Sequence, residues 1–152
     1  MKIIVGVDDS PHSQAAVKWV REMRWPADTR FIVYSASGFP AYVLVEPAGA
    51  SVYERLEQDQ LTAHDELAAQ AEQELRGAGL TASRRVERGD PREGLVHTAE
   101  TEHADLIVVG SHGRTGFPRL IMGSVASHVV THAPCTVTVV KLPRAQATGR
   151  PS

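Results

Sequence analysis

Gly110 ends an apolar segment, and Gly113, Gly123 and Ser124 follow it at positions that suit phosphate binding. The segment Asp105–Gly110 is typical of a buried strand, Gly113 lies in the following loop, and Gly123 and Ser124 open an apolar helical stretch. A strand, a glycine-rich loop and a helix start in this order direct main-chain N–H groups and the positive end of a helix at one place. The pattern therefore predicts an anion site, and a nucleotide phosphate is the anion that we expect.

The spacing of these residues differs from the two commonest nucleotide motifs. G-x2-G-x9-G-S is neither GxxxxGK[ST] nor GxGxxG, and no lysine follows the glycines. Two glycines after a strand would indicate only an ordinary turn. We favour phosphate binding because the complete spacing is present.

Charged side chains near the loop add to the expected site. His112 and Arg114 are the nearby basic residues. Asp8, at the end of the first apolar segment, could hydrogen-bond ribose hydroxyls or hold a divalent metal through the phosphates. The alternative role of Asp8 is to cap the next helix, for which Asp9 and Ser10 are equally suited, and we expect Asp9 to be a cap.

The elements that must position these residues alternate between strand and helix. Apolar runs of strand length alternate with longer stretches of helical period, which is typical of βαβ units and a parallel sheet. We expect strands at residues 2–7, 30–35, 80–86, 105–109 and 136–140, and helices from Pro11 to about Met23, at 52–76, from Pro91 to about Glu102, and at 119–132. Ala16, Val17, Val20 and Met23 share one face of the first helix. The third strand is the most polar, which predicts an edge position.

Right-handed crossovers and a central first strand give the sheet order 3-2-1-4-5. This order describes a three-layer, open, doubly wound parallel sheet of five strands. Its ligand crevice lies at the carboxyl ends of strands one and four, where Asp8 and Gly110 fall. Residues 37–51 form the longest irregular stretch, and long loops in compact domains are often functional covers.

Size and charge restrict the possible classes of protein. With 152 residues and a formal net charge of −2, the chain fits one domain, 1–142, and gives no bulk electrostatic reason to bind nucleic acid or a membrane surface. We expect no leader, no anchor and a disordered tail at 143–152. The single cysteine, Cys135, suits a reducing compartment, so we expect a cytoplasmic protein.

Other residues suggest alternatives that we weigh against simpler interpretations. His128 and His132 have metal-ligand spacing on one helix, but no third ligand is evident, so surface histidines are the favoured interpretation. Ser111 beside His112 suggests a nucleophile, but we expect adjacent side chains to diverge, and G-x-S-x-G is absent.

The tryptophans give no strong sign of a base-stacking platform, and the candidate catalytic groups give no strong sign of an enzyme. Trp19 and Trp25 suit packing or the surface better than a base-stacking platform. Phosphoryl transfer needs a metal, a charge-stabilising group and a means of activating the attacking group, and no convincing base is evident. Binding is therefore favoured over catalysis.

Three segments resemble the universal stress protein family: GSHGRTGFPRLIMGS around the glycines, the opening IIVGVDDSPHS, and the closing HAPCTVTVVK. The resemblance covers Lys2 to Lys141. It implies an adenine-nucleotide alpha-hydrolase-like fold, a homodimer through the last strand, and ATP in members that keep the glycines. Because Asp8 could hold a divalent metal through the phosphates, we expect magnesium to accompany the ATP.

Transferred residue by residue, the resemblance also implies the arrangement of the site. Asp8 and Gly110 would face the ribose, and Gly113, Gly123 and Ser124 would face the phosphates. The other implied site residues are His112, Arg114 and Val125, which would line the site, and Val7, Ala36 and Val109 at the adenine end.

Two positions depart from the family pattern. Ala126, just after Gly-Ser-Val, is smaller than the residue that some relatives carry there, which can remove one polar contact to phosphate. Thr136 stands where a proline often precedes the last strand, and it frees an N–H group near the strand through which many relatives dimerise.

The leading hypothesis is an ATP-binding, homodimeric regulatory protein. One alternative is a slow ATPase or nucleotide hydrolase in which Asp8 holds a metal and Arg114 offsets developing charge. Another is a nucleotide-free dimerisation module in which the loop is structural. The glycines argue against this alternative, because a purely structural turn would not require all of them at this spacing.

Overall fold

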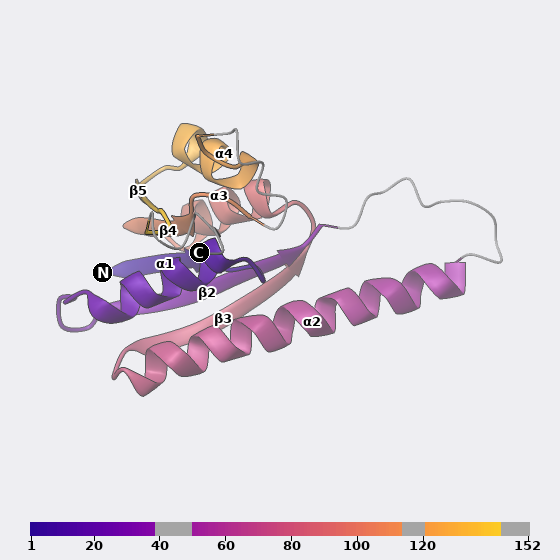
Figure 1. The fold of residues 1–152 in the computed structure, drawn as a ribbon, viewed down its shortest axis with the longest axis horizontal. Coiled ribbons are helices and arrows are strands. Elements are labelled where there is room, and N and C mark those ends of the chain that lie inside the picture. Colours follow the sequence, from indigo (N-terminus) through magenta and orange to yellow (C-terminus); the bar gives the residue numbers. More distant parts are fainter. Residues whose placement is uncertain (39–49, 114–120, 144–152) are drawn as a thin grey trace, which may run out of the picture.

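The strands form one parallel sheet in the order β3-β2-β1-β4-β5 (Figure 1). The computed structural model describes residues 1–38, 50–113 and 121–143. Its elements are β1 Lys2–Gly6, α1 Pro11–Glu22, β2 Arg30–Ser37, α2 Ala50–Gly77, β3 Thr81–Arg88, α3 Pro91–Thr101, β4 Leu106–Gly110, α4 Ser124–His132 and β5 Thr136–Val140. The predicted strand order is confirmed. Residues 39–49 of the predicted irregular stretch and residues 144–152 of the predicted tail lie outside the described residues.

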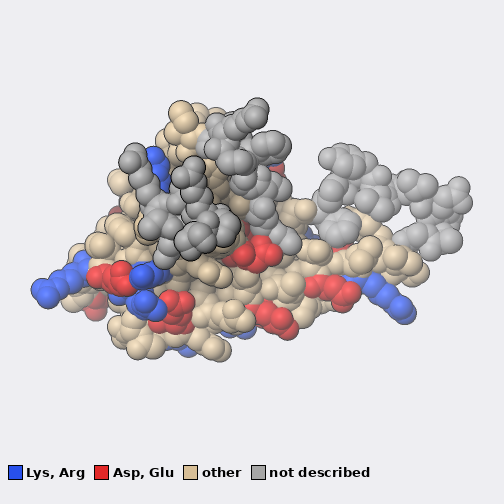
Figure 2. Space-filling model, in the orientation of Figure 1, with Lys and Arg blue, Asp and Glu red and all other residues tan. Residues whose placement is uncertain are grey.

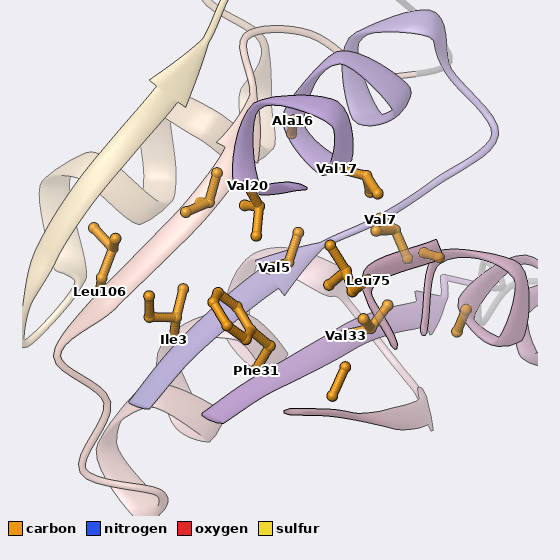
Figure 3. Packing of buried hydrophobic residues seen from close by; sticks show 14 residues of the cluster. Ile3, Val5, Val7, Ala16, Val17, Val20, Phe31, Val33, Leu75 and Leu106 are labelled. Carbon is orange, nitrogen blue, oxygen red and sulfur yellow. The ribbon is translucent and has the colours of Figure 1, made fainter. Parts of the chain in front are cut away.

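Helices cover both faces of the sheet, which explains why its central strands are continuously apolar. Successive side chains of a strand point to opposite faces, so Ile3 and Val5 of β1 face one layer and Ile4 faces the other. On the first face the side chains of α1, α2, β1 and β2 meet in one apolar cluster (Figure 3). On the second face, Leu95 of α3 and Val129 of α4 cover β4 and the other side of β1.

Helix α1 begins where the sequence contains a serine followed by a proline. Ser10 is the N-cap, and its hydroxyl oxygen accepts the N–H of Ser13 at 3.1 Å. The expectation that Asp9 caps this helix is therefore wrong, because the chain places Ser10 at the cap position. Met23 is 42% exposed and follows the last helical residue, so it does not share the buried face of α1.

Helix α4 starts later than the sequence pattern indicated. The predicted range 119–132 is wrong at its beginning, because Gly123 is extended, with φ −70° and ψ 168°, and the helix begins at Ser124. Helix α2 ends at Gly77, one residue beyond the predicted range 52–76, and Gly79 adopts the left-handed conformation at φ +84°. The N–H of Leu80 then donates to the carbonyl of Leu75 at 3.1 Å, which is typical of a glycine-terminated helix.

The edge position predicted for β3 is confirmed, and its polar side chains have partners on α2. Arg84 donates to Asp65 at 2.9 Å and to Glu72 at 2.8 Å. These ion pairs link the most polar strand to the helix beside it. Polarity at this edge is therefore compatible with regular pairing to β2.

The tryptophans pack at the end of α1, as expected. The indole N–H of Trp25 donates to the carbonyl of Val20 at 2.8 Å. Its ring meets Trp19 and Phe31 edge-on, with centroid separations of 5.8 Å and 5.6 Å. These rings anchor the turn between α1 and β2.

The described residues form neither a large patch of one charge on the face in view (Figure 2) nor a helix long and apolar enough to cross a membrane. Figure 2 shows acidic and basic side chains intermingled on the face in view. Within residues 1–38, 50–113 and 121–143, no helix combines the length and the apolar composition needed to cross a membrane.

Gly94 of α3 offers a test of the packing between α3 and β2. A Cβ at this position would overlap the buried hydroxyl of Tyr34. Replacing glycine by alanine inside a helix normally raises stability. Here the overlap with Tyr34 makes the change destabilising, so we expect Gly94→Ala to lower the free energy of unfolding by about 1–3 kcal/mol in urea titrations. The control is Gly77→Ala, where an added Cβ meets nothing within 4 Å. Equal stability of the two variants would contradict the packing.

Candidate functional site

A crevice of about 510 Å³ opens at the carboxyl ends of β1, β2 and β4. This is the place where the strand order reverses, as the sequence predicted. Its volume lies within the roughly 300–1,000 Å³ that is usual for small-molecule sites. The first turn of α4 and one side of α2 complete its walls.

Most of the predicted site residues meet in this crevice, although they come from distant parts of the chain. Those that line it are Val7, Asp8, Ala36, Val109, Gly110, His112, Gly113, Gly123, Ser124 and Val125. Arg114 lies outside the described residues. The geometry brings these residues together, and their contacts with a ligand stay a prediction.

Helix α2 contributes side chains to the crevice that no sequence pattern indicated. Gln60 and His64, one helical turn apart, line the crevice together with Ser35 of β2. The Ser35 hydroxyl donates to the carbonyl oxygen of Val7 at 3.0 Å, and it lies 2.7 Å from Nδ1 of His64. The i, i+4 spacing of Gln60 and His64 shows that they share a helix face, but it does not show that this face meets the crevice.

The three glycines of the motif lie where separate chain segments approach one another closely. A Cβ on Gly110 would lie 2.6–2.8 Å from atoms of His12, including its main-chain carbonyl group. A Cβ on Gly123 would lie 3.0 Å from Cα of His112, and one on Gly113 would lie 2.9 Å from Oδ2 of Asp8. The start of α1, the loop after β4 and the start of α4 therefore converge because side chains are absent at Gly110 and Gly123.

The start of α4 differs from the other helix starts whose caps are described. Ser10 caps α1 and Asp90 caps α3 through their side chains, whereas α4 begins at Gly123 with no side-chain cap bond among the described residues. The first N–H groups of a helix have no partner within it. Because Ser124 and Val125 line the crevice, the positive end of α4 faces it.

The charged groups of the crevice are few. Among its described lining residues, Asp8 is the one carboxylate and there is no lysine or arginine. The carboxylate of Asp8 accepts the N–H of Ser10 at 2.9 Å. Burial, followed by the nearby Glu87, raises the pKa of Tyr34 well above its usual value, so this lining side chain is a neutral hydroxyl.

Ser111 and two histidines form a polar cluster next to the crevice. The Ser111 hydroxyl oxygen lies 3.0 Å from Nδ1 of His112 and 3.1 Å from Nδ1 of His12. The expectation that the side chains of Ser111 and His112 diverge is therefore wrong, because strand alternation ends at Gly110 and the chain bends there. Ser111 is only 2% exposed, which makes it unsuitable as a nucleophile.

His128 and His132 lie close together, but the described residues provide no third metal ligand beside them. Their rings lie 4.4 Å apart, and Nε2 of His128 is 3.4 Å from Oε1 of Glu93. Within the described ranges, no group of three His, Cys, Asp or Glu residues could hold a metal ion.

Comparisons with known proteins agree with the geometry. The model of the universal stress protein family matches residues 1–141. A universal stress protein of Mycolicibacterium smegmatis is 31% identical over 149 residues, which is 93% of this chain and 46% of the relative. The chain spans 33%, 46% and 42% of the length of three curated relatives that it matches.

Solved structures show the same fold. The universal stress protein UspA from Lactobacillus plantarum is 26% identical with a TM-score of 0.81, and the match covers 92% of this chain and 97% of that one. A universal stress protein in complex with cAMP is also 26% identical, with a TM-score of 0.61 and coverage of 92% and 95%. These neighbours confirm the expected adenine-nucleotide alpha-hydrolase-like fold.

Gly110 and Gly113 allow a paired test of the converging segments. Gly110→Ala places its methyl group against the main chain of His12, which cannot rotate away, so we expect a loss of about 1–3 kcal/mol in the free energy of unfolding. Gly113→Ala meets only the carboxylate oxygen of Asp8, which can rotate, so we expect a loss of less than about 1 kcal/mol. Denaturant titration measures both, and a larger loss for Gly113→Ala would contradict the convergence.

Proposed function

The chain belongs to the universal stress protein family, and from this premise we propose that it is an ATP-binding regulatory protein that acts as a homodimer. The observation that carries the proposal is the crevice at the sheet's reversal, where the motif glycines and the uncapped start of α4 come together. A related structure of the same fold is described as a complex with cAMP. That relative supports an adenine nucleotide as the class of ligand.

The polarity of the crevice supports one orientation of the nucleotide. Val7, Ala36 and Val109 are apolar and at most 8% exposed, which suits the flat, apolar faces of adenine. Gly113 and Ser124 lie towards the loop and the helix start, where main-chain N–H groups suit phosphate. We assign Asp8, which also lines the crevice, to the hydroxyls of ribose.

Magnesium fits only as a companion of the phosphates. The described residues contain no cluster of three metal-binding side chains, and one carboxylate oxygen of Asp8 already accepts the N–H of Ser10. Magnesium usually keeps several waters and binds through substrate phosphates with one or two carboxylates. Whether Asp8 contacts such an ion stays a prediction.

We propose binding and signalling in preference to turnover. The Ser111 hydroxyl is buried, and the histidine that lies nearest to the expected phosphates is held by that hydroxyl. The bound and empty states would then present different surfaces to a partner protein. We place this activity in the cytoplasm, because one cysteine, Cys135, suits a reducing compartment.

Isothermal titration with magnesium ATP tests the proposed function. We expect micromolar binding by the unaltered protein and a loss of at least about tenfold in affinity for Gly113→Val and Gly123→Val, because their side chains press on Asp8 and on the loop after β4 at the expected phosphate end. Gly77→Ala, far from the crevice, is the matched control, and circular dichroism checks that each variant is folded. No heat with the unaltered protein, together with no nucleotide in the purified sample, would reject the proposal.

The homodimer can be tested at β5, an edge strand of the described sheet. In an antiparallel strand pair about a twofold axis, the central residue Thr138 faces its own copy, so two glutamates there would repel one another. We therefore expect Thr138→Glu to shift sedimentation from dimer towards monomer, whereas Thr62→Glu on the exposed side of α2 does not. An unchanged dimer in Thr138→Glu would place the interface elsewhere.

A further inference from the structure

Among the described residues, the source of positive charge in the crevice is open, because Arg114 lies outside them. The described lining of the crevice contains Asp8 and no lysine or arginine. The start of α4 contributes only a partial charge, about half of one elementary charge. Histidine is therefore the one side-chain type in the described lining that can become cationic near neutral pH.

Two histidines are joined by one buried hydroxyl at the expected phosphate end. His12 lies in the first turn of α1, whereas Ser111 and His112 follow β4. The two Nδ1 atoms lie 3.1 Å and 3.0 Å from the Ser111 hydroxyl oxygen, and the ring centroids are 5.0 Å apart. His112 also lines the crevice itself, next to Gly113.

Hydrogen counting shows that this cluster can accept a proton without losing a bond. A hydroxyl has one proton and two lone pairs, so with both rings neutral one Nδ1 accepts from Ser111 and the other donates to it. Where His12 is the ring that donates through Nδ1, it can gain a proton at Nε2 while its bond to Ser111 stays intact. One added positive charge therefore needs no rearrangement of the cluster.

Building on the proposed function, we propose that His12, Ser111 and His112 form a proton-binding relay that supplies positive charge to the phosphate end of the crevice, so that nucleotide phosphate and a proton bind together. His12 carries the proton but does not line the crevice, so it acts on the phosphate end through Ser111 as a positioning residue. The proton comes from solvent and bonds to Nε2 of the ring, and no bond between heavier atoms changes.

The charges around His12 set the direction of the effect. Burial lowers the pKa of His12 below its usual value, the neighbouring His112 lowers it further, and Asp8 from the β1–α1 loop raises it. On the β5 side, the main-chain carbonyl of Val140 accepts the N–H of Ser111, and Lys141 after it is exposed. His12 is therefore neutral at pH 7 without ligand.

A bound phosphate reverses this balance, because its negative charge favours the protonated relay. Nucleotide affinity then rises as the pH falls through the range in which the complex keeps the proton and the free protein does not. For one proton the change reaches about tenfold per pH unit at most, and it levels off below that range.

The test is isothermal titration with ATP in the presence of EDTA at about pH 5.8 to 8.2, a range that brackets the usual pKa of about 6.5 for histidine. Each titration is repeated in two buffers of different ionisation enthalpy. The two buffers give the number of protons taken up per ATP bound. His12→Gln keeps a hydrogen-bonding side chain but cannot carry the charge, and Ser111→Ala breaks the relay. His97→Gln, on an exposed position of α3, is the matched control.

We expect proton uptake to fall in both relay variants and to stay unchanged in His97→Gln. Comparison at the same pH removes the titration of ATP itself, and adenosine, which has no phosphate, should bind with little pH dependence. If the unaltered protein and His12→Gln take up the same number of protons, the relay is wrong while nucleotide binding stands. If ATP does not bind at any pH, the proposed function fails as well.

Discussion

The fold of this protein depends on a close main-chain contact between the start of α1 and the end of β4. Gly110 lies so near to His12 that even a methyl group would meet main-chain atoms. This contact holds the first helix over the sheet's reversal and sets where the loop after β4 must turn. The loop in turn lies against Gly123, whose N–H donates to the carbonyl of Ser111 at 2.7 Å. Three segments from both ends of the chain are thereby fixed around one crevice.

The same contacts change how the glycine motif should be interpreted. We counted the glycines against a purely structural loop, because a simple turn would not need all of them. The structure gives Gly110 and Gly123 packing reasons that would hold without any ligand. The spacing therefore indicates a convergence of chain segments, whereas the crevice and the uncapped start of α4 are the features that favour an anion.

How much could be predicted from the sequence depended on the range of the interactions involved. The strand order followed from local apolar runs and from the handedness of crossovers, and ten described site residues converge where that order reverses. The start of α4 was misplaced because apolar residues before Gly123 continue a helical period that the extended glycine interrupts. The contact between His12 and Ser111 joins positions 99 residues apart, and no pattern within either segment indicates it.

The division of charge at this crevice suits a protein that responds to conditions. The partial charge at the start of α4 is built into the backbone and is present at every pH. The charge on the histidine relay depends on a proton, so it can be gained when an anion arrives and lost when the anion leaves. A lysine in the same place would bind phosphate more strongly, but its charge, and so its affinity for phosphate, would not change over this pH range. Under the proposed relay, occupancy of the crevice follows both nucleotide and proton concentration, which is a useful property in a regulator and an unnecessary one in a constitutive binding protein.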